Sequence, residues 1–245
     1  MAPQISAHLS EVFTSVEGEG LFAGRPSTFV RFSECNLSCS YCDTDYARRR
    51  QDVMLAHHGR AERQVANPVG LEDLVALVCE GASAPEAVVF TGGEPLLQSG
   101  FLGQAARHLK RLGFEVHLET NGTLPEALLG VRDALDLVSM DVKLPSSQGG
   151  RNFFGAHRDF LGALAGVRAV VKIVLQEQSE DAEISEALSL VASVNRFLPV
   201  LLQPAFVDSR PSVGAERLLS VLGAARLKLH DVRLSAQMHK VLGVR

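Results

Sequence analysis

The sequence predicts an α/β protein with a mostly parallel sheet, and three observations support this fold class. Short apolar runs alternate with segments of helical periodicity along the chain. The runs are continuously apolar, as in strands that helices cover on both faces. The helical segments between them have the length of about 10 to 15 residues that connects parallel strands in βαβ units. At 245 residues the chain is long enough for one large domain or two small ones.

The predicted elements follow from these patterns. Apolar runs predict strands at Thr28–Phe32, Ala87–Phe90, Phe114–Leu118, Leu135–Met140, Ala169–Leu175, Pro199–Leu202 and Asp231–Leu234. Apolar residues spaced three and four apart predict helices at Leu71–Glu80, Gln98–Leu112, Asp181–Arg196 and Ala215–Ala225. The segment Tyr46–Pro68 has no clear period and carries several Arg and His residues. We predict a solvated loop there, with a basic patch for a partner or for RNA as the alternative.

Composition and charge exclude several classes of protein. The chain is 46% hydrophobic and 21% charged, an ordinary globular balance. Its net charge of -4 gives no electrostatic reason to expect nucleic acid as a partner. The longest uncharged apolar stretches, such as Phe197 to Val207, are much shorter than the about 20 residues that span a bilayer. Because no signal peptide is visible and cysteines are few, we expect a cytoplasmic protein without a membrane segment.

Three of the four cysteines lie close together, in Cys35-Asn-Leu-Ser-Cys39-Ser-Tyr-Cys42, directly after the strand predicted at Thr28–Phe32. Clustered thiols in a reducing compartment indicate metal or redox chemistry. Three thiolates are one ligand short of a closed zinc site or four-iron site. The spacing therefore leaves two interpretations: zinc completed by Cys79 or a histidine, or a [4Fe–4S] cluster with one iron open to a ligand. Because Cys79 lies between apolar neighbours in a predicted helix, we expect it to be a buried structural thiol.

The cysteine spacing resembles the radical S-adenosylmethionine (SAM) superfamily, which has C-x3-C-x2-C after its first strand. A second element follows in the expected order, because Thr91-Gly92-Gly93-Glu94-Pro95 comes after the next predicted strand. This element resembles the Gly-Gly-Glu sequence that receives the amino group of SAM. In this interpretation Gly93 lets the backbone approach the ligand closely, and Glu94 accepts a hydrogen bond from its ammonium group.

Further motifs are similar to those of the 7-carboxy-7-deazaguanine synthase family, a radical SAM family of deazapurine (queuosine-type) biosynthesis. They cover nearly the whole chain: Phe13-Thr-Ser-Val16-Glu17-Gly18-Glu19-Gly20, Phe29-Val30-Arg31-Phe32, Cys42-Asp43-Thr44, Glu119-Thr-Asn121-Gly122-Thr123, Ser139-Met-Asp141-Val142-Lys143, Leu202-Gln203-Pro204 and Gln237-Met-His239-Lys240. The family commonly has Gln where this chain has Glu17. An ionised carboxylate at this position can only accept hydrogen bonds, whereas an amide also donates them.

The resemblance implies a shortened, partial (β/α) barrel of about six parallel strands, in one domain over residues 1–245 with a cluster-binding loop at 33–50. It also implies a homodimer that converts 6-carboxy-5,6,7,8-tetrahydropterin to 7-carboxy-7-deazaguanine with loss of ammonia. The implied cofactors are a [4Fe–4S] cluster, SAM and Mg²⁺, with an external flavodoxin-like or ferredoxin-like electron donor. In this chemistry one electron cleaves SAM to a 5′-deoxyadenosyl radical, which removes a hydrogen atom from the pterin.

The resemblance implies roles for individual residues as well. Cys35, Cys39 and Cys42 would hold three irons of the cluster, and Thr44 would ligate Mg²⁺. The implied SAM contacts are Tyr41, Asp43, Gly93, Glu94, Asn121, Asp141, Val142 and Lys143. The implied substrate contacts are Val16, Glu17, Gly18, Glu19, Arg31, Thr91 and Gln203.

Residue chemistry supports some of these roles and leaves alternatives for others. The guanidinium fork of Arg31 matches the two oxygens of a carboxylate. Mg²⁺ takes hard oxygen ligands, often few of them from protein, which suits a single Thr44 hydroxyl. Lys143 could instead pair locally with Asp141. Asn121 could form the Glu-Thr-Asn-Gly turn rather than bind SAM.

Two other function classes stay open on the sequence alone. A glycyl-radical-enzyme activase would share the cysteine triplet and the Gly-Gly-Glu element. Such an activase acts on a protein partner, however, and would leave Thr44 and the Glu-Gly-Glu-Gly segment unexplained. A non-catalytic regulatory module that carries zinc or a cluster would explain the thiols alone.

Overall fold

Strands and helices alternate along most of the chain, of which the computed structural model describes residues 5–58, 61–81, 87–207 and 210–244. The strands are β1 (Ser6–Ala7), β2 (Leu9–Val16), β3 (Pro26–Phe32), β4 (Val53–His58), β5 (Ala61–Ala66), β6 (Val69–Gly70), β7 (Ala87–Gly92), β8 (Glu115–Thr120), β9 (Leu137–Val142), β10 (Ala169–Leu175), β11 (Val200–Pro204), β12 (Phe206–Val207), β13 (Arg210–Pro211) and β14 (Val232–Leu234). The α-helices are α1 (Leu71–Gly81), α2 (Ser99–Arg111), α3 (Pro125–Leu129), α4 (Phe154–Ala163), α5 (Asp181–Asn195), α6 (Ala215–Arg226) and α7 (Met238–Leu242). Short 3-10 helices are η1 (Asp45–Arg48), η2 (Pro95–Gln98), η3 (Arg132–Ala134) and η4 (Pro145–Gln148).

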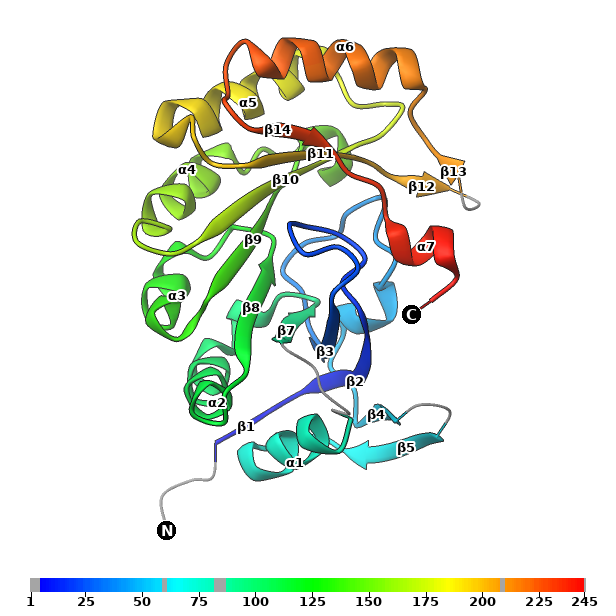
Figure 1. The fold of residues 1–245 in the computed structure, drawn as a ribbon, viewed down its shortest axis with the longest axis vertical. Helices are drawn as coiled ribbons and strands as arrows, with labels where there is room; N and C mark the ends of the chain where they lie inside the picture. The colour runs from blue at the N-terminus through cyan, green and yellow to red at the C-terminus, as the bar shows by residue number, and fades with distance from the viewer. Residues whose placement is uncertain (1–4, 59–60, 82–86, 208–209, 245) are drawn as a thin grey trace.

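A curved ten-stranded sheet forms the centre of the fold, with the order β14-β11-β10-β9-β8-β7-β3-β2-β4-β5 (Figure 1). Each strand from β14 to β3 is parallel to its neighbours. The last three strands are mixed, because β2 is antiparallel to β3, parallel to β4, and followed by the antiparallel pair β4 and β5. The sheet stays open at both ends, which confirms the predicted α/β fold with a partial barrel.

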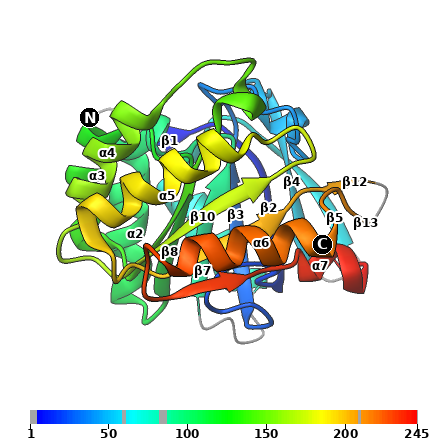
Figure 2. The same cartoon turned by 90° about the horizontal axis from the view of Figure 1, so that it is seen from above.

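The helices α2 to α6 lie along the outer side of the sheet, and the loops that follow β2 and β3 lie on its inner side with α7 (Figures 1 and 2). Both faces of the central strands are covered, so β7 and β10 are buried along most of their length. Phe32, Phe90 and Phe160 are fully buried in the core between the sheet and the outer helices. The continuous apolar runs of the sequence are therefore explained by burial on two sides.

The loop predicted at Tyr46–Pro68 is wrong. This segment contains most of η1 and the strands β4 and β5, and β6 begins directly after it at Val69. The β4–β5 hairpin forms one edge of the sheet, and the side chains of β5 are mostly exposed. A solvated edge strand has no apolar run to reveal it. Its basic residues are largely neutralised, since Arg63 pairs with Glu80 and Arg50 with Glu34, while Arg60 lies outside the described residues.

Several further elements are absent from the predicted set: strands β1, β2, β6, β12 and β13 and helices α3, α4 and α7. Strand β2 was not predicted because its apolar run is interrupted by Ser10 and Glu11, which are nevertheless buried. Helix α4 was not predicted because Gly155 and Gly162 weaken its helical pattern. The other predicted strands and helices are present within a few residues, and Ala169–Leu175 coincides with β10.

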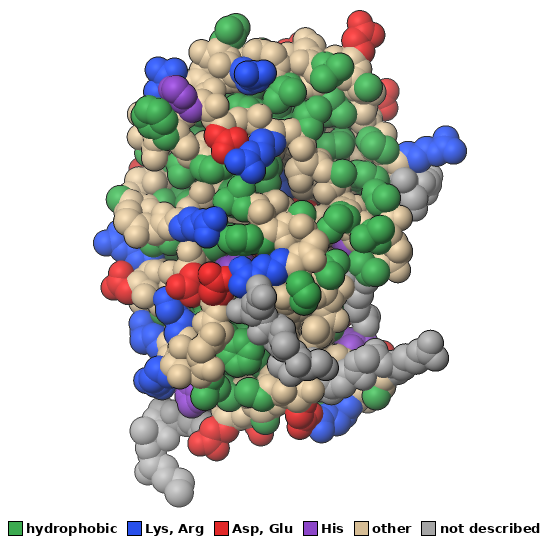
Figure 3. Space-filling view, viewed as in Figure 1, with side chains coloured by type: hydrophobic (Ala, Val, Ile, Leu, Met, Phe, Trp, Pro, Cys, Tyr) green, Lys and Arg blue, Asp and Glu red, His purple; other side chains and the backbone are tan. Residues whose placement is uncertain are grey.

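On the face shown in Figure 3, lysines and arginines are interspersed with acidic side chains. None of the helices in the described part of the chain combines the length and apolarity that a bilayer span requires.

Candidate functional site

A cavity of about 430 Å³ lies at the carboxyl ends of the parallel strands, the edge at which α/β sheets bind ligands. Six neighbouring strands each send at least one polar side chain into it, including, in strand order, Arg31, Thr91, Glu119, Asp141, Lys172 and Gln203. The volume is within the range of about 300 to 1,000 Å³ of small-molecule sites. The loop after β2, the cysteine loop and the C-terminal segment complete the wall. The position and size of the cavity suit a small ligand together with a cofactor.

Most of the predicted site residues line this cavity: Val16, Gly18, Glu19, Arg31, Cys35, Cys39, Tyr41, Cys42, Asp43, Thr44, Thr91, Gly93, Asn121, Asp141, Lys143 and Gln203. Glu17, Glu94 and Val142 are not among the lining residues. Val142 is 1% exposed and packs in the core, since strand alternation places it opposite Asp141 and Lys143. The role predicted for Val142 is therefore limited to its backbone.

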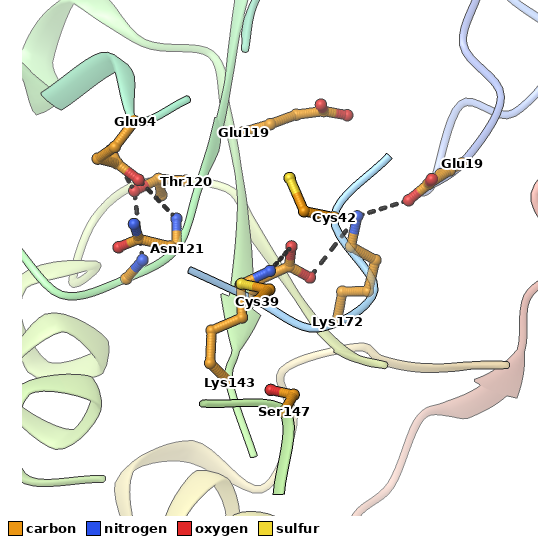
Figure 4. Close-up of polar contacts among 12 residues, drawn as sticks. Glu19, Cys39, Cys42, Glu94, Glu119, Thr120, Asn121, Lys143, Ser147 and Lys172 are labelled. Atoms are coloured by element: carbon orange, nitrogen blue, oxygen red, sulfur yellow. Dashed lines mark hydrogen bonds and ion pairs between the residues drawn. The ribbon is translucent and has the colours of Figure 1, made fainter. Parts of the chain in front are cut away.

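The Glu94 side chain has several hydrogen-bond partners inside the protein, and its predicted contact with SAM stays a prediction. Its carboxylate is fully buried and accepts hydrogen bonds from the Asn121 amide (2.8 Å), the Leu96 amide (3.0 Å) and the Thr120 hydroxyl (2.8 Å). Burial outweighs these donors and raises the pKa of Glu94 to about 7. The part of this turn that faces the cavity is the backbone of Gly92 and Gly93, while Glu94 joins the ends of β7 and β8 (Figure 4).

Gly93 permits a close approach between two backbone segments. A Cβ at this position would lie 2.0 Å from the carbonyl oxygen of Glu34, and the Glu94 amide donates to that same oxygen (2.8 Å). Glu34 itself has a left-handed backbone (φ 74°) and directly precedes Cys35. The Gly-Gly-Glu element therefore fixes the start of the cysteine loop. The sequence analysis instead explains Gly93 by a close approach of the backbone to a ligand.

Glu17 points away from the cavity. Its carboxylate accepts from the Ser27 hydroxyl (2.9 Å) and lies 3.3 Å from His117 Nδ1. The substrate contact predicted for this side chain is not supported by its position. The neighbouring residues that do line the cavity are Val16, Gly18 and Glu19.

The three clustered thiols face the same cavity and suit an iron–sulfur cluster. Cys35, Cys39 and Cys42 all line it and are free thiols. Among the described residues, no three His, Cys, Asp or Glu side chains are grouped as a single metal ion would require. A mononuclear zinc site draws its ligands to one ion, whereas a [4Fe–4S] cluster distributes three thiolates over three irons. Cys79 is exposed on α1, which corrects the prediction of a buried thiol and removes it from the site.

A buried ammonium group joins two sides of the cavity. Lys172 Nζ donates to Glu19 and lies 3.6 Å from Asp141 Oδ1 (Figure 4). Burial opposes ionisation of Glu19, but Lys172 and the amides of Gln237 and Gln203 outweigh it and lower the Glu19 pKa to about 2. Glu19 is therefore held as an anion. An anionic carboxylate at the cavity wall accepts hydrogen bonds from N–H groups of a ligand.

Arg31 is oriented by a residue that sequence reasoning missed. The buried carboxylate of Glu11 accepts from Arg31 Nε (2.7 Å) and from the Tyr46 hydroxyl (2.6 Å). The hydrogen bond at Nε leaves the two terminal nitrogens of Arg31 for other partners. Beside this group Phe13 and Phe29 stack with ring centroids 5.0 Å apart, and both line the cavity. The wall near Arg31 thus combines a cation with a flat aromatic surface.

The structure also bears on the two alternatives for Lys143 and Asn121. Lys143 Nζ donates to Asp141 Oδ2 (2.7 Å) and lies over the Tyr41 ring, 5.3 Å from its centroid. Asn121 accepts from the Thr123 amide (3.1 Å), as a turn residue does, and also donates to Asn36 Oδ1 (2.8 Å). Both residues therefore have structural partners while they line the cavity.

Other functional positions could have been found from a local signal. Lys172 interrupts an otherwise apolar strand, which is a sign of a special role because an unpaired buried charge is costly. Glu119 ends a buried strand and accepts from the Thr91 hydroxyl (2.6 Å), and its burial raises its pKa. Gln237, His239 and Lys240 reach the cavity from the C-terminal segment, whose motif resembles the family but whose residues have no individual role in the sequence analysis.

Comparison with known proteins agrees with this geometry. The sequence profile of the Radical SAM superfamily matches residues 30–174. A 7-carboxy-7-deazaguanine synthase from Geobacter sulfurreducens is 37% identical over 97% of this chain and 97% of its own length. The chain belongs to the 7-carboxy-7-deazaguanine synthase family. A second member, from Methanopyrus kandleri, is also 37% identical and covers 98% of this chain and 95% of its own length. Membership of the radical SAM superfamily implies a [4Fe–4S] cluster and SAM as cofactors.

Solved structures show the same fold at lower identity. The crystal structure of QueE from Escherichia coli superposes with a TM-score of 0.64, at 22% identity, over 96% of this chain and 95% of that chain. A domain of a pyruvate-formate lyase-activating enzyme from Bacteroides vulgatus has a TM-score of 0.52 at 19% identity and covers 61% of this chain. The likeness to the activase is one of fold, whereas the likeness to the 7-carboxy-7-deazaguanine synthases extends along the whole sequence.

Substitution of Gly93 tests the close backbone approach. Gly93→Ala is expected to lower the free energy of unfolding by about 1–3 kcal/mol, because the new Cβ would overlap the Glu34 carbonyl oxygen. Gly100→Ala is the matched control, since Gly100 lies in α2 with open space around it and gains helix propensity. Urea unfolding measures both values, and equal effects of the two substitutions would contradict the packing argument.

Removal of the buried cation tests the electrostatics of the cavity. Lys172→Met is expected to lower the free energy of unfolding by about 3–5 kcal/mol at pH 7, because buried carboxylates lose their partner. Lys172 depresses the Glu19 pKa from 4.5 to about 2, so this stabilisation is present above about pH 4.5 and lost as the pH falls towards 2. The difference between parent and variant should therefore shrink on acidification in urea unfolding series.

Lys240→Met is the control for this prediction, because Lys240 pairs with Asp43 (2.9 Å) at a partly exposed position. An exposed ion pair contributes less than about 1 kcal/mol. If the Lys172 and Lys240 variants lose the same stability at pH 7, Lys172 does not act as a buried counter-ion.

Proposed function

We propose that this chain converts 6-carboxy-5,6,7,8-tetrahydropterin to 7-carboxy-7-deazaguanine with loss of ammonia, using a [4Fe–4S] cluster, SAM and Mg²⁺. One observation carries the proposal. The three thiols that can hold a cluster share one cavity with a cation and an anion suited to a carboxylated pterin, Arg31 and Glu19. A glycyl-radical-enzyme activase acts on a protein partner and would leave Thr44 and the Glu-Gly-Glu-Gly segment unexplained.

The cysteine loop and the strand ends beside it would hold the cofactors. Cys35, Cys39 and Cys42 are suited to three irons, which leaves the fourth for SAM. When bound, the cluster and SAM supply the one-electron chemistry that starts the reaction. The backbone of Gly93 and the Asp141–Lys143 pair lie on the same side of the cavity as the thiols and would bind the polar groups of SAM. These groups are fixed by the sheet, so they need no rearrangement to meet the cofactor.

The other side of the cavity would bind the pterin. The terminal nitrogens of Arg31 match a carboxylate, and Glu11 holds them in position. Glu19 is kept anionic by Lys172 and would accept from the N–H groups of the ring, as would Gln203 Oε1, which is buried and has no protein partner among the described residues. The Phe13–Phe29 surface is flat enough for the ring system to stack on it.

Thr44 would supply the protein ligand of Mg²⁺. Its hydroxyl lies 3.8 Å from the Cys42 sulfur and faces the cavity beside Asp43. Mg²⁺ commonly keeps waters and substrate oxygens as ligands and needs few from protein. A single hydroxyl in the cysteine loop, lining the same cavity as Arg31, would suit a metal that takes its other ligands from water and substrate oxygens.

Two partners belong to the proposal. An external flavodoxin-like or ferredoxin-like protein would deliver the electron to the cluster. A second copy of the chain would form a homodimer. The open sheet edge at β14 and helix α7 carry exposed apolar side chains that could take part, Leu234, Val241 and Leu242.

Product analysis tests the proposed reaction. Protein reconstituted anaerobically with iron and sulfide, then given SAM, Mg²⁺, a reductant and the carboxy-tetrahydropterin, is expected to yield 7-carboxy-7-deazaguanine by mass spectrometry. Cys39→Ala should lose the cluster absorbance, SAM cleavage and product together. Intact SAM cleavage in this variant would remove the thiol triplet from the mechanism, and a colourless protein with one zinc would support the regulatory module instead.

Removal of the Thr44 hydroxyl tests the metal site. Thr44→Ala is expected to raise the Mg²⁺ concentration for half-maximal activity by about 10-fold, the loss of one metal–oxygen contact of about 1.4 kcal/mol, with an unchanged cluster spectrum. Thr14→Ala is the control, because that hydroxyl pairs with Thr28 outside the cavity (3.1 Å). A Mg²⁺ titration of Thr44→Ala that matches both parent and control would refute this assignment.

A further inference from the structure

We propose that Gln148 tunes the reduction potential of the cluster through a hydrogen bond to Cys39, an inference that rests on the proposed cofactor. Gln148 lies at the end of η4, after β9, and is distant from the cysteine loop in sequence. Its amide nitrogen Nε2 is nonetheless 2.9 Å from Cys39 Sγ. Because an amide N–H only donates and a thiolate only accepts, this contact orients a donor at a sulfur that would bind iron.

The position of Gln148 is determined by the surrounding fold. Its side chain is only 3% exposed. The turn that carries it is tied to α5, because the backbone amide and hydroxyl of Ser146 donate to Glu183. It is also tied to the cysteine loop, because the Ser40 amide donates to the Ser147 carbonyl oxygen (3.0 Å). Side chains held in this way keep their geometry during a reaction.

The Gln148 contact is the shortest donor contact to a cysteine sulfur in the described part of the site. Cys35 accepts from the Leu37 amide at 3.4 Å and lies 4.0 Å from Asn121 Nδ2. The Thr44 hydroxyl is 3.8 Å from Cys42 Sγ. Backbone donors of the loop are a consequence of its conformation, whereas Gln148 is a side chain that another residue type could replace. Among the described side chains near a cysteine sulfur, Gln148 makes a closer contact than Asn121 or Thr44.

The physical effect has a definite sign. One-electron reduction adds a negative charge to the cluster and its thiolates, and a donor at a sulfur stabilises the reduced form more than the oxidised form. Hydrogen bonds to the sulfurs are among the factors that set iron–sulfur potentials. Burial strengthens the effect, because water cannot replace the lost donor and the local dielectric is low. Gln148 is thus expected to raise the potential and to make the cluster easier to reduce.

A redox titration tests this inference without measuring turnover. Parent protein, Gln148→Leu and Gln148→Glu are reconstituted anaerobically without SAM, and the reduced cluster is followed by electron paramagnetic resonance at fixed potentials. At the midpoint potential of the parent, Gln148→Leu should hold about tenfold less reduced than oxidised cluster, which is a shift of about 59 mV for one electron. Gln148→Glu should shift further in the same direction, because it places a negative charge at the sulfur.

Gln176→Leu is the matched control, because Gln176 accepts from the Ser40 hydroxyl (3.0 Å) and anchors the same loop without touching a sulfur. Its potential should equal that of the parent. An unchanged potential in Gln148→Leu, or an equal shift in Gln176→Leu, would overturn the inference. Gln148→Met, which keeps the length without a donor, repeats the test if the leucine variant binds no iron. If both variants fold but bind no iron, Gln148 has a structural role and the inference fails.

Failure of the proposed reaction would appear in the product analysis, whereas failure of the proposed cofactor would appear in this titration. The parent protein itself would then assemble no [4Fe–4S] cluster, and no potential could be measured for it. A parent with a cluster and a Gln148→Leu variant with the same potential would leave the proposed reaction intact and remove only the tuning role.

Discussion

The site depends on the place where the chain after β3 passes against the end of β7. The two backbones approach so closely at Glu34 and Gly93 that a side chain at the glycine would overlap a carbonyl oxygen. This contact sets where Cys35 begins the cysteine loop. In the same turn, the buried carboxylate of Glu94 accepts a hydrogen bond from the backbone amide of Asn121. The Asn121 side chain in turn donates to Asn36 within the loop. Three segments far apart in sequence are therefore fixed relative to one another by contacts within the protein.

Charge inside the cavity is balanced by partners on neighbouring strands. Lys172 pairs with Glu19 and Asp141, and Lys143 pairs with Asp141. Arg31 pairs with the buried carboxylate of Glu11. Charged groups in a poorly hydrated site are stable only when paired. Such pairs also form fixed dipoles around the bound molecules, which do not have to reorganise during the reaction. The ion pairs that stabilise these charged side chains at the strand ends thus also hold them in position to bind polar ligands.

The fold and the chemistry are carried by different parts of the molecule. The activase domain from Bacteroides vulgatus has a similar fold at 19% identity, so the curved sheet alone does not specify a reaction. What differs between such enzymes is the set of side chains at the strand ends and in the loops. In this chain those positions include Arg31, Thr44, Lys172 and Gln148. A function argued from this molecule therefore has to be argued from these residues rather than from its architecture.

Much of the fold was predictable because burial leaves a pattern in the sequence. The apolar run Ala169–Leu175 coincides with a strand that is covered on both faces. The exposed strand Ala61–Ala66 was missed because its side chains face solvent and carry no such pattern. Strand β2 was missed because Glu11 interrupts it, and the reason for a buried carboxylate there lies on another strand, at Arg31.

The sequence by itself determined the cysteine spacing, the Gly-Gly-Glu element and the family, because these are local patterns with a fixed order. Only the tertiary structure decided which side chains face the cavity. In the folded protein, the Glu17 and Glu94 side chains have their partners inside the protein, and Lys172 lies between two carboxylates. Gln148 contacts the sulfur of Cys39, which lies 109 positions earlier. Direction and pairing of this kind depend on contacts between distant segments, and no local pattern of residues records them.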